Sequence, residues 1–259
     1  MRPHRAEDGR VAERELKGAV AATIVGGRLV FVGAGTSGRL GVLEAAECPP
    51  TFGTPPALVQ AVMAGGRSSV FRAREGAEDD AADGARQVRR RARRGDVVVG
   101  VAASGVTPFV LGALAEARRR GAATVLVTCN PGIARSAARV VVPLAVGPEI
   151  LAGSTRLKAG TATKLALNTL TTAVFVRLGK VHGNRMVDLL PRSAKLRARA
   201  AALVVELGHV APRDAQRLLA AAGGRAKLAI VMARLGVDRR EAARRLAAVH
   251  GFLGRALHP

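Results

Sequence analysis

The fold of this chain is decided by the stretch Leu29-Val30-Phe31-Val32-Gly33-Ala34-Gly35-Thr36-Ser37-Gly38-Arg39. It opens with four apolar residues, two of them β-branched valines, and such a run favours a buried β-strand. A glycine-rich turn follows, and the residues from about Ser37 to Glu47 are typical of a helix. A strand that passes through a tight turn directly into a helix is the first unit of an α/β fold.

The same pattern recurs along the chain. Apolar runs separated by helix-length segments predict further strands at residues 58–63, 96–102, 124–129 and 140–146. Continuous apolar strands that alternate with helices indicate a parallel sheet covered on both faces. We therefore predict an α/β fold: a doubly wound, about five-stranded parallel sheet sandwiched by helices.

After residue 150 the pattern becomes helical. Residues 157–178 predict one long helix, and from about Ser193 only helical periodicity remains. Pro212 opens one of these later helices, and Asp238 is a good N-cap for the last of them. We predict a main domain at 1–192 and a small C-terminal helical module at 193–259. A single helix at about 11–24 is expected before the first strand.

Composition limits the class of protein. Apolar residues make up 49% of the 259 residues, a proportion typical of a globular chain rather than a disordered one. The longest apolar runs, such as Val97–Ala103, are far too short to span a bilayer. The first residues contain no apolar segment of the kind found in secretory signals. We expect a cytoplasmic protein with no membrane partner.

The net charge of +22 raises the question of nucleic-acid binding. The excess is nearly all arginine and is densest at Arg86–Arg94. This cluster is either a solvated surface, the interpretation that we favour, or a patch that faces an anion. The few aromatic residues do not interleave with it, so the stacking platform of a single-strand binder is missing. We expect no nucleic-acid partner.

The two cysteines, Cys48 and Cys129, lie far apart, and neither forms a Cys-x-x-Cys pair. This argues against a zinc ribbon and against a disulfide framework. Cys129 ends an apolar run, and we interpret it as a buried structural thiol. We expect no metal site.

The glycine-rich turn after the first strand is a candidate anion site. Its glycines let the backbone approach an anion, and N–H groups at a helix start point toward it. Thr36 and Ser37 add hydroxyl donors between Gly35 and Gly38. The turn is not a Walker loop, because no Gly-Lys-Ser/Thr follows. It matches only half of the dinucleotide fingerprint, because no acidic residue closes the second strand.

Two more hydroxyl-rich segments precede helices. Ser104 and Thr107 follow the strand at 96–102, and Ser154, Thr155 and Lys158 open the long helix. In an open parallel sheet, ligands bind at the carboxyl ends of the strands near a topological switch. Three such helix starts favour a phosphate pocket over ordinary structural caps.

Two carboxylates are candidates for proton transfer. Glu47 precedes Cys48-Pro49-Pro50, where we predict that the first helix ends, so its carboxylate would face the negative end of the helix dipole. Such a position suits a general acid, although exposed glutamates at helix ends are also common. Glu78 lies in an acidic cluster of a basic chain, and taken alone it fits a solvated turn.

Several long motifs closely resemble the N-acetylmuramic acid 6-phosphate etherase family. They are the run Gly33–Gly41, the run Ala46-Glu47-Cys48-Pro49-Pro50-Thr51-Phe52-Gly53-Thr54, Glu75–Asp79, Val99–Gly105, Gly153–Thr161 and Gly179–Asp188. The resemblance runs from about residue 28 to the end of the chain. It implies a sugar isomerase-type, phosphosugar-binding domain at 1–192 and a homodimer.

The resemblance also implies an activity. Members cleave the lactyl ether of N-acetylmuramic acid 6-phosphate and release N-acetylglucosamine 6-phosphate and D-lactate in peptidoglycan recycling. The family's proton donor falls on Glu47, and its other active-site carboxylate falls on Glu78. Ring opening gives a C1 aldehyde that acidifies the C2 proton, so one carboxylate removes this proton while another protonates the departing oxygen. Water then adds back, and no metal or cofactor is required.

One departure concerns substrate binding. Members usually carry arginine and tyrosine where this chain has Val106 and Phe109. We expect the lost cation to weaken ligand binding or to alter specificity. The alternative function is a non-catalytic phosphosugar regulator on the same fold, such as the related glucokinase regulatory proteins. The presence of both Glu47 and Glu78 favours the enzyme.

Overall fold

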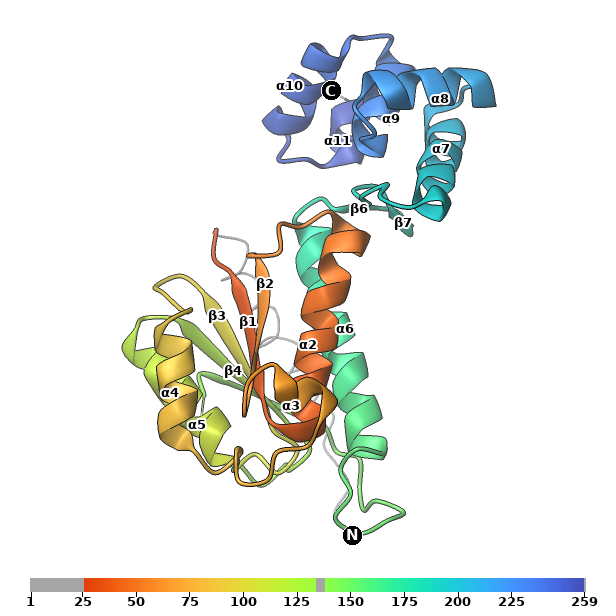
Figure 1. The fold of residues 1–259 in the computed structure, drawn as a ribbon. Coiled ribbons are helices and arrows are strands. Elements are labelled where there is room, and N and C mark those ends of the chain that lie inside the picture. The colour runs from red at the N-terminus through yellow and green to blue at the C-terminus, as the bar shows by residue number, and fades with distance from the viewer. Residues whose placement is uncertain (1–25, 134–137, 259) are drawn as a thin grey trace. The chain divides into compact units, whose positions relative to one another are not determined.

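The computed structural model describes residues 26–133 and 138–258 (Figure 1). It separates into two compact units, residues 1–46 with 56–174 and residues 47–55 with 175–259. The helix expected at 11–24 lies outside the described residues. The predicted domain boundary after residue 192 stays a prediction.

The first unit is built on a parallel sheet with the strand order β2-β1-β3-β4-β5. The strands are β1 (Leu29–Gly33), β2 (Val59–Met63), β3 (Val97–Val101), β4 (Ala123–Thr128) and β5 (Val140–Pro143). This confirms the predicted five-stranded parallel sheet. The last strand is shorter than predicted and ends at Pro143, which pairs with Thr128, the last residue of β4.

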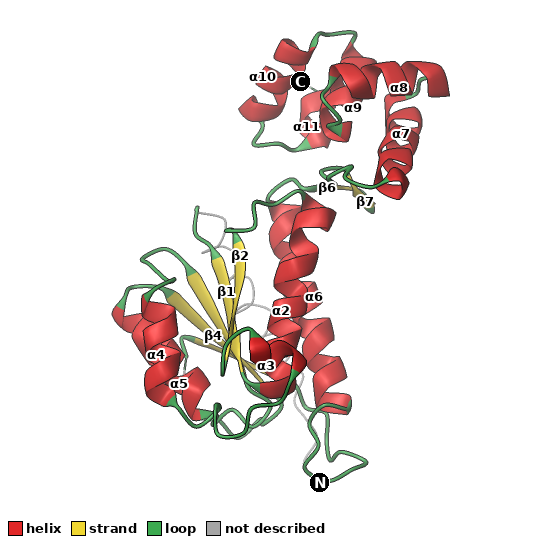
Figure 2. Cartoon of the chain, in the orientation of Figure 1, coloured by secondary structure: helices red, strands yellow, loops and turns green. Residues whose placement is uncertain are grey.

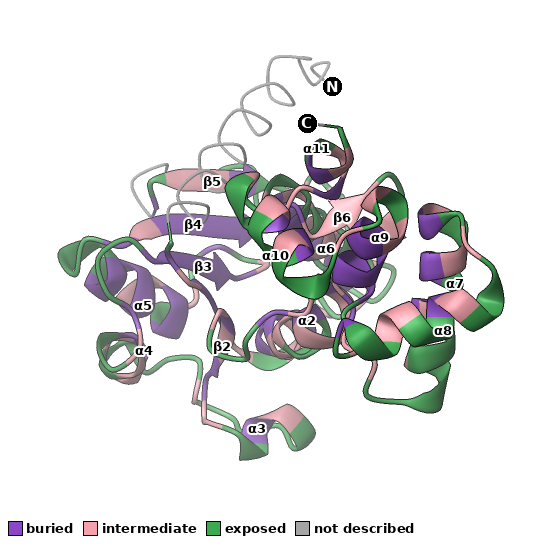
Figure 3. Ribbon diagram, turned by 90° about the horizontal axis from the view of Figure 1, so that it is seen from above, coloured by how far each residue is buried: buried purple, intermediate pink, exposed green. Residues whose placement is uncertain are grey.

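Helices cover both faces of the sheet (Figures 1 and 2). On one face lie α4 (Ala81–Arg89) and α5 (Pro108–Arg119), and on the other lie α2 (Gly35–Phe52) and α6 (Lys158–Arg177). Val30 and Val32 of β1 join the core formed with α4 and α5. β3 and β4 are buried almost throughout, because both of their faces are covered (Figure 3). The doubly wound α/β prediction is confirmed.

Helix α2 packs closely on the sheet at a glycine. A methyl group on Gly41 would lie 2.8 Å from the Cβ atom of Phe31, which is fully buried. Only a residue without a side chain lets the helix approach this large ring so closely. The contact fixes the helix that follows the glycine-rich loop.

The predicted end of α2 before Pro49 is wrong. The helix continues through Pro49 and Pro50 to Phe52, and the Gly53 N–H donates to the Pro49 carbonyl over 3.0 Å. The fixed φ of proline is compatible with a helix, although each proline removes one i→i−4 hydrogen bond. Glu47 therefore does not lie at the C-terminal end of the helix.

The second unit is helical, as predicted for the C-terminal part. Its helices are α7 (Ala194–Gly208), α8 (Pro212–Ala221), α9 (Ala226–Leu235), α10 (Arg239–Ala248) and α11 (Leu253–Leu257), preceded by the short ribbon of β6 (Val181–His182) and β7 (Arg185–Met186). Ser193 and Asp238 cap α7 and α10 by accepting backbone N–H groups. Helix α9 is buried along most of its length and forms the centre of this core.

A buried lysine ties the helical unit together. The Lys227 Nζ donates to the Gly179 carbonyl (2.8 Å), to Asp188 Oδ2 (2.6 Å) and to the Gly251 carbonyl (3.0 Å). Burial lowers the pKa of this ammonium, and the nearby Asp188 carboxylate opposes the shift. Its three donors thus join three segments that are distant in sequence.

Several members of the cluster Arg86–Arg94 have partners in the first unit. Arg89 and Arg119 both donate to the buried carboxylate of Glu116, whose pKa they lower to about 2, the hydrogen bond from Arg119 having the largest effect. Arg86 pairs with Asp83. These contacts favour the interpretation as a solvated, internally paired surface.

Candidate active site

The sheet has its topological switch at β1. From this strand the chain crosses to β2 on one side, whereas β3 pairs with β1 on the other side. Gly33 at the end of β1 is in register with Met63 and with Val101, the last residues of β2 and β3. The loops after these three strands therefore begin side by side at one edge of the sheet, where open α/β sheets bind ligands.

The loop after β1 is shaped by its glycines. Gly35 has a φ of +54°, and a methyl group on Gly38 would lie 2.5 Å from the Gly33 carbonyl oxygen. The Thr36 and Ser37 hydroxyls form no hydrogen bond with any residue that the structure describes. The turn thus leaves two hydroxyl donors at the start of a helix, the arrangement that suits an anion.

The other two predicted binding segments lie at the same edge of the sheet. A methyl group on Gly160 in the first turn of α6 would meet the Thr36 Cγ2 atom at 3.6 Å. Cys129 donates its N–H to the Ala103 carbonyl (2.9 Å), and its thiol contacts the Ala159 carbonyl at 3.9 Å. Burial raises the pKa of this thiol. The start of α6 therefore lies next to the loops that follow β1, β3 and β4.

Two N–H groups at the start of α6 are already used. The Glu149 carboxylate accepts the Lys158 N–H at 3.0 Å and the Ala159 N–H at 2.9 Å. A carboxylate here neutralises the positive end of the helix dipole. The loop between Glu149 and Lys158 is thereby closed. A phosphate contact through Ser154, Thr155 and Lys158 stays a prediction.

Removing this capping carboxylate should loosen that loop. We expect Glu149→Ala to lower the free energy of unfolding by about 1 kcal/mol, the usual cost of a lost helix cap. Glu149→Gln keeps one acceptor oxygen and should cost less. Urea denaturation of the two variants measures the difference, and equal stability of Glu149→Ala and the wild type would contradict the capping role.

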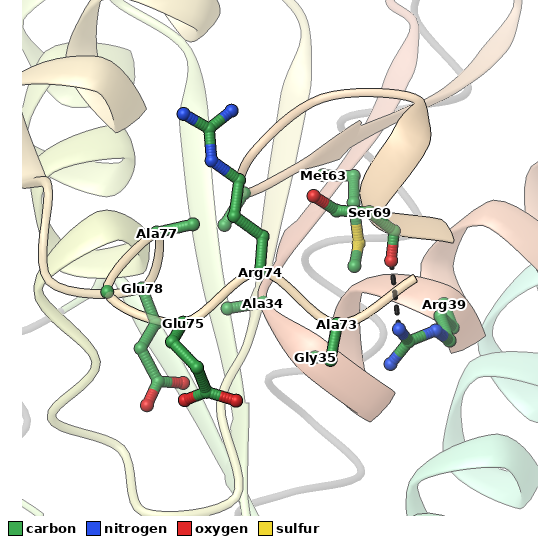
Figure 4. Close-up of a pocket in the computed structure, with 12 residues that line it drawn as sticks. Ala34, Gly35, Arg39, Met63, Ser69, Ala73, Arg74, Glu75, Ala77 and Glu78 are labelled. Carbon is green, nitrogen blue, oxygen red and sulfur yellow. Dashed lines mark hydrogen bonds between the residues drawn. The ribbon is translucent and has the colours of Figure 1, made fainter. Parts of the chain in front are cut away.

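A hollow of about 230 Å³ lies between the loops after β1 and β2 (Figure 4). Gly35 lines it from the first loop, and Ser69, Arg74, Glu75 and Glu78 line it from the second. The hollow therefore joins Gly35 of the predicted anion loop to Glu78, one of the two predicted carboxylates, whereas Thr36, Ser37 and Gly38 are not among the residues that line it.

Arg39 holds the second loop in place. Its Nε donates to the Val70 carbonyl (2.8 Å) and its Nη2 to the Ser69 carbonyl (2.9 Å), at the short helix α3 (Ser68–Phe71). The role of Arg39 could not be predicted from the sequence, because its partners lie about 30 residues away and only the fold brings them together.

The turn that carries Glu78 is anchored to α5. The Phe109 N–H, two residues after the N-cap residue Thr107 of that helix, donates to the Glu78 carbonyl over 2.9 Å. The Glu78 side chain is exposed and has no partner among the residues described. Its carboxylate is therefore free to exchange a proton with a ligand in the hollow.

The structure places the remaining predicted residues as follows. Glu47 is exposed on α2, ten residues beyond Ser37, or about 15 Å along the helix axis, and is not among the residues that line the hollow. Val106 is 57% exposed and Phe109 is fully buried. The Ser104 hydroxyl accepts the Val106 N–H at 3.3 Å. The catalytic pairing of Glu47 with Glu78 stays a prediction.

Within residues 26–133 and 138–258, no three or more His, Cys, Asp or Glu side chains gather as a metal-binding set. In the same part of the chain, no helix combines the length and the apolar character needed to cross a bilayer.

Comparison with known proteins identifies close relatives. N-acetylmuramic acid 6-phosphate etherase from Symbiobacterium thermophilum is 56% identical over 213 residues, which cover 82% of this chain and 71% of that protein. The enzyme of the same name from Rubrobacter xylanophilus is 54% identical, covering 90% of this chain and 79% of that protein. A family model described as the glucokinase regulatory protein N-terminal SIS domain matches residues 12–118.

Solved structures support the fold. A phosphoheptose isomerase from Francisella tularensis superposes with a TM-score of 0.50 at 18% sequence identity, covering 66% of this chain and 90% of that structure. At this identity the likeness concerns the arrangement of sheet and helices alone.

Proposed function

This chain belongs to the N-acetylmuramic acid 6-phosphate etherase family, and we propose that the hollow described above is part of its active site. The reaction consumes one water and converts N-acetylmuramic acid 6-phosphate to N-acetylglucosamine 6-phosphate and D-lactate. The observation that carries the proposal is the junction, in one hollow, of the glycine-rich anion loop with the unpaired carboxylate of Glu78.

We assign the phosphate to the hydroxyl-rich segments at the edge of the sheet. Thr36 and Ser37 present free hydroxyls beside the first turn of α6, where Gly160 leaves room for Thr36. The Gly35 backbone N–H, together with Ser104, Thr107, Ser154, Thr155 and Lys158, supplies the other proposed donors. The Gly38 N–H already donates to the Ala34 carbonyl at 3.1 Å, so we assign Gly38 a contact through its backbone, since this residue carries no side chain. Hydroxyl and amide donors suit phosphate oxygens, and the Lys158 ammonium offsets part of their charge.

The chemistry proposed is elimination followed by addition. In the open-chain sugar the C1 aldehyde makes the C2 proton acidic, and Glu78 removes this proton. The C3–O bond then breaks, and Glu47 protonates the departing lactate oxygen. Water adds at C3 of the resulting C2–C3 alkene, a proton returns to C2, and the hydroxyl at C3 is restored. Two carboxylates of opposite protonation state are sufficient for these steps.

The proposal includes a homodimer in the cytoplasm. Both follow from the family resemblance, and a phosphorylated sugar is a charged molecule that does not cross a lipid bilayer unaided. Glu47 is exposed on α2 and is not among the residues that line the hollow, and we propose that the second subunit of the homodimer brings this carboxylate to the ligand.

Isotopes test the proposed route directly. In D₂O the sugar product should carry deuterium at C2, and in H₂¹⁸O the new oxygen should appear at C3 of the sugar and not in lactate. Glu47→Gln should release no D-lactate under the same conditions. A product with the label in lactate would show cleavage on the other side of the ether oxygen and would contradict the elimination.

Restoring a cation at position 106 should tighten substrate binding. Val106 is exposed in a loop at the ligand-binding edge of the sheet, and residues 102–107 contain no charged side chain. We expect Val106→Arg to lower the KM for N-acetylmuramic acid 6-phosphate by about tenfold, the effect of one charge-assisted hydrogen bond. Val106→Leu is the matched control. An unchanged KM in Val106→Arg would contradict a ligand contact at this position.

A further inference from the structure

Two polar groups in the hollow are not used by the chemistry described above. The Ser69 hydroxyl has no hydrogen-bond partner among the described residues, although this residue is only 3% exposed. Arg74 lines the same hollow and forms no hydrogen bond or ion pair with any described residue. Because an unpaired buried hydroxyl destabilises a fold, its presence in the wall of a binding hollow points to a ligand atom.

These two groups lie against the same point of the loop after β2. A methyl group on Gly65 would fall 2.3 Å from Ser69 Oγ and 3.1 Å from Arg74 Cδ. Figure 4 shows the Arg74 guanidinium directed away from the carboxylates of Glu75 and Glu78. The neighbouring acids therefore leave its charge available to another partner.

Arg74 is the cation in the hollow that remains available to an anion. Arg39, the other cation in the lining, already donates through Nε and Nη2 to two backbone carbonyls. The two acidic residues in the lining, Glu75 and Glu78, cannot neutralise a ligand anion. An arginine fork matches a carboxylate, which accepts several hydrogen bonds in one plane, and the Ser69 hydroxyl lies near the Arg74 side-chain stem.

We propose that Arg74 and Ser69 form a subsite for the carboxylate of the substrate's D-lactyl group. This inference rests on the proposed etherase function. The substrate carries two anions, and the hydroxyl-rich segments are assigned to the phosphate. The lactyl carboxylate is attached one carbon beyond the ether oxygen. When C2 of the substrate faces Glu78, this carboxylate therefore extends along the loop toward Ser69. The Arg74 guanidinium then balances the charge of this carboxylate, first in the substrate and then in the departing lactate.

The test compares a ligand that has the lactyl group with one that lacks it. For Arg74→Ala we expect kcat/KM for N-acetylmuramic acid 6-phosphate to fall about 30-fold, as for a lost charged hydrogen bond. The inhibition constant of N-acetylglucosamine 6-phosphate should stay within about twofold, because this product has no carboxylate. Arg74→Lys keeps the positive charge but not the planar guanidinium. Its kcat/KM should lie between those of the wild type and of Arg74→Ala.

Ser69→Ala separates ligand binding from folding. This variant should lower kcat/KM about fivefold, for one lost neutral hydrogen bond, and yet raise the Tm of the free protein by about 2 °C, because it removes an unpaired hydroxyl. A Tm below that of the wild type would overturn the role assigned to Ser69. Arg72→Ala is the matched control for Arg74→Ala, since Arg72 is exposed on the same loop but does not line the hollow.

Two results for Arg74→Ala would overturn the subsite. One is an unchanged kcat/KM, and the other is an equal loss of affinity for N-acetylglucosamine 6-phosphate. Both results can be obtained only if the wild type releases D-lactate. They would therefore overturn the subsite without contradicting the proposed etherase function. A wild type that releases no D-lactate would instead reject the etherase function, and the lactyl subsite with it.

Discussion

Replacing Glu78 by glutamine will lower kcat for D-lactate release by roughly 10³-fold, the range expected for loss of a general base. The amide has the shape of the carboxylate but cannot take the C2 proton. Because the Glu78 side chain is exposed and unpaired among the described residues, the fold should be unaffected and the Tm unchanged. Steady-state assay of D-lactate gives kcat, and differential scanning fluorimetry gives the Tm.

A second readout ties this loss to the proton transfer assigned to Glu78. The wild type should exchange the C2 proton of N-acetylglucosamine 6-phosphate with D₂O, and Glu78→Gln should not. Asp79→Asn is the matched control, because Asp79 is the exposed neighbour and lies outside the lining of the hollow. If Glu75→Gln abolished the exchange and Glu78→Gln retained it, the base would be Glu75.

The largest effect on stability is expected at Lys227. Lys227→Met should lower the free energy of unfolding of the helical unit by about 3 kcal/mol, as when one partner of a buried ion pair is removed. The change leaves the Gly179 and Gly251 carbonyls without this donor and deprives Asp188 of its contact at 2.6 Å. The urea midpoint of helix unfolding, followed by circular dichroism, measures the loss.

Lys180 supplies the control for this prediction. Its ammonium contacts the same Asp188 carboxylate at 3.1 Å, but its side chain is 29% exposed. Lys180→Met should therefore cost at most about 1 kcal/mol, the value for solvent-accessible pairs. If Lys180→Met and Lys227→Met lowered the free energy of unfolding equally, burial of the Lys227 ammonium would not add to the stability.

The strands β1 and β3 could be predicted from the sequence because each is a continuous apolar run buried on both faces of the sheet. The Val97–Val101 run contains four valines and is buried at every position. The predicted cap at Asp238 was equally local, since its carboxylate accepts an N–H three residues later. Features that depend on residues only a few positions apart can be predicted from the sequence without knowledge of the fold.

The features that escaped prediction depend on contacts made by the fold. Pro49 and Pro50 are strong local signals for a helix end, but the helix continues to Phe52, whose ring stacks on Phe175 at 4.5 Å. Tertiary packing outweighs the local preference here. Glu149 caps a helix nine residues ahead, and Arg39 binds carbonyls of another loop, so neither has a recognisable local pattern.

The candidate site also combines features that were predicted from local motifs with features that only the fold reveals. The glycine-rich loop and Glu78 were recognised from motifs, and the structure adds that both line one hollow. Ser69 and Arg74 carry no motif, because a serine becomes notable only once its hydroxyl is seen to be buried and unpaired.

The central claim is that this hollow belongs to an etherase and not to a non-catalytic phosphosugar sensor. The most direct test is incubation of the purified chain with N-acetylmuramic acid 6-phosphate, with D-lactate and N-acetylglucosamine 6-phosphate measured over time. We predict that the two products appear in equal amounts until the substrate is consumed. If no D-lactate were released while the substrate raised the Tm of the protein, binding without turnover would contradict the account.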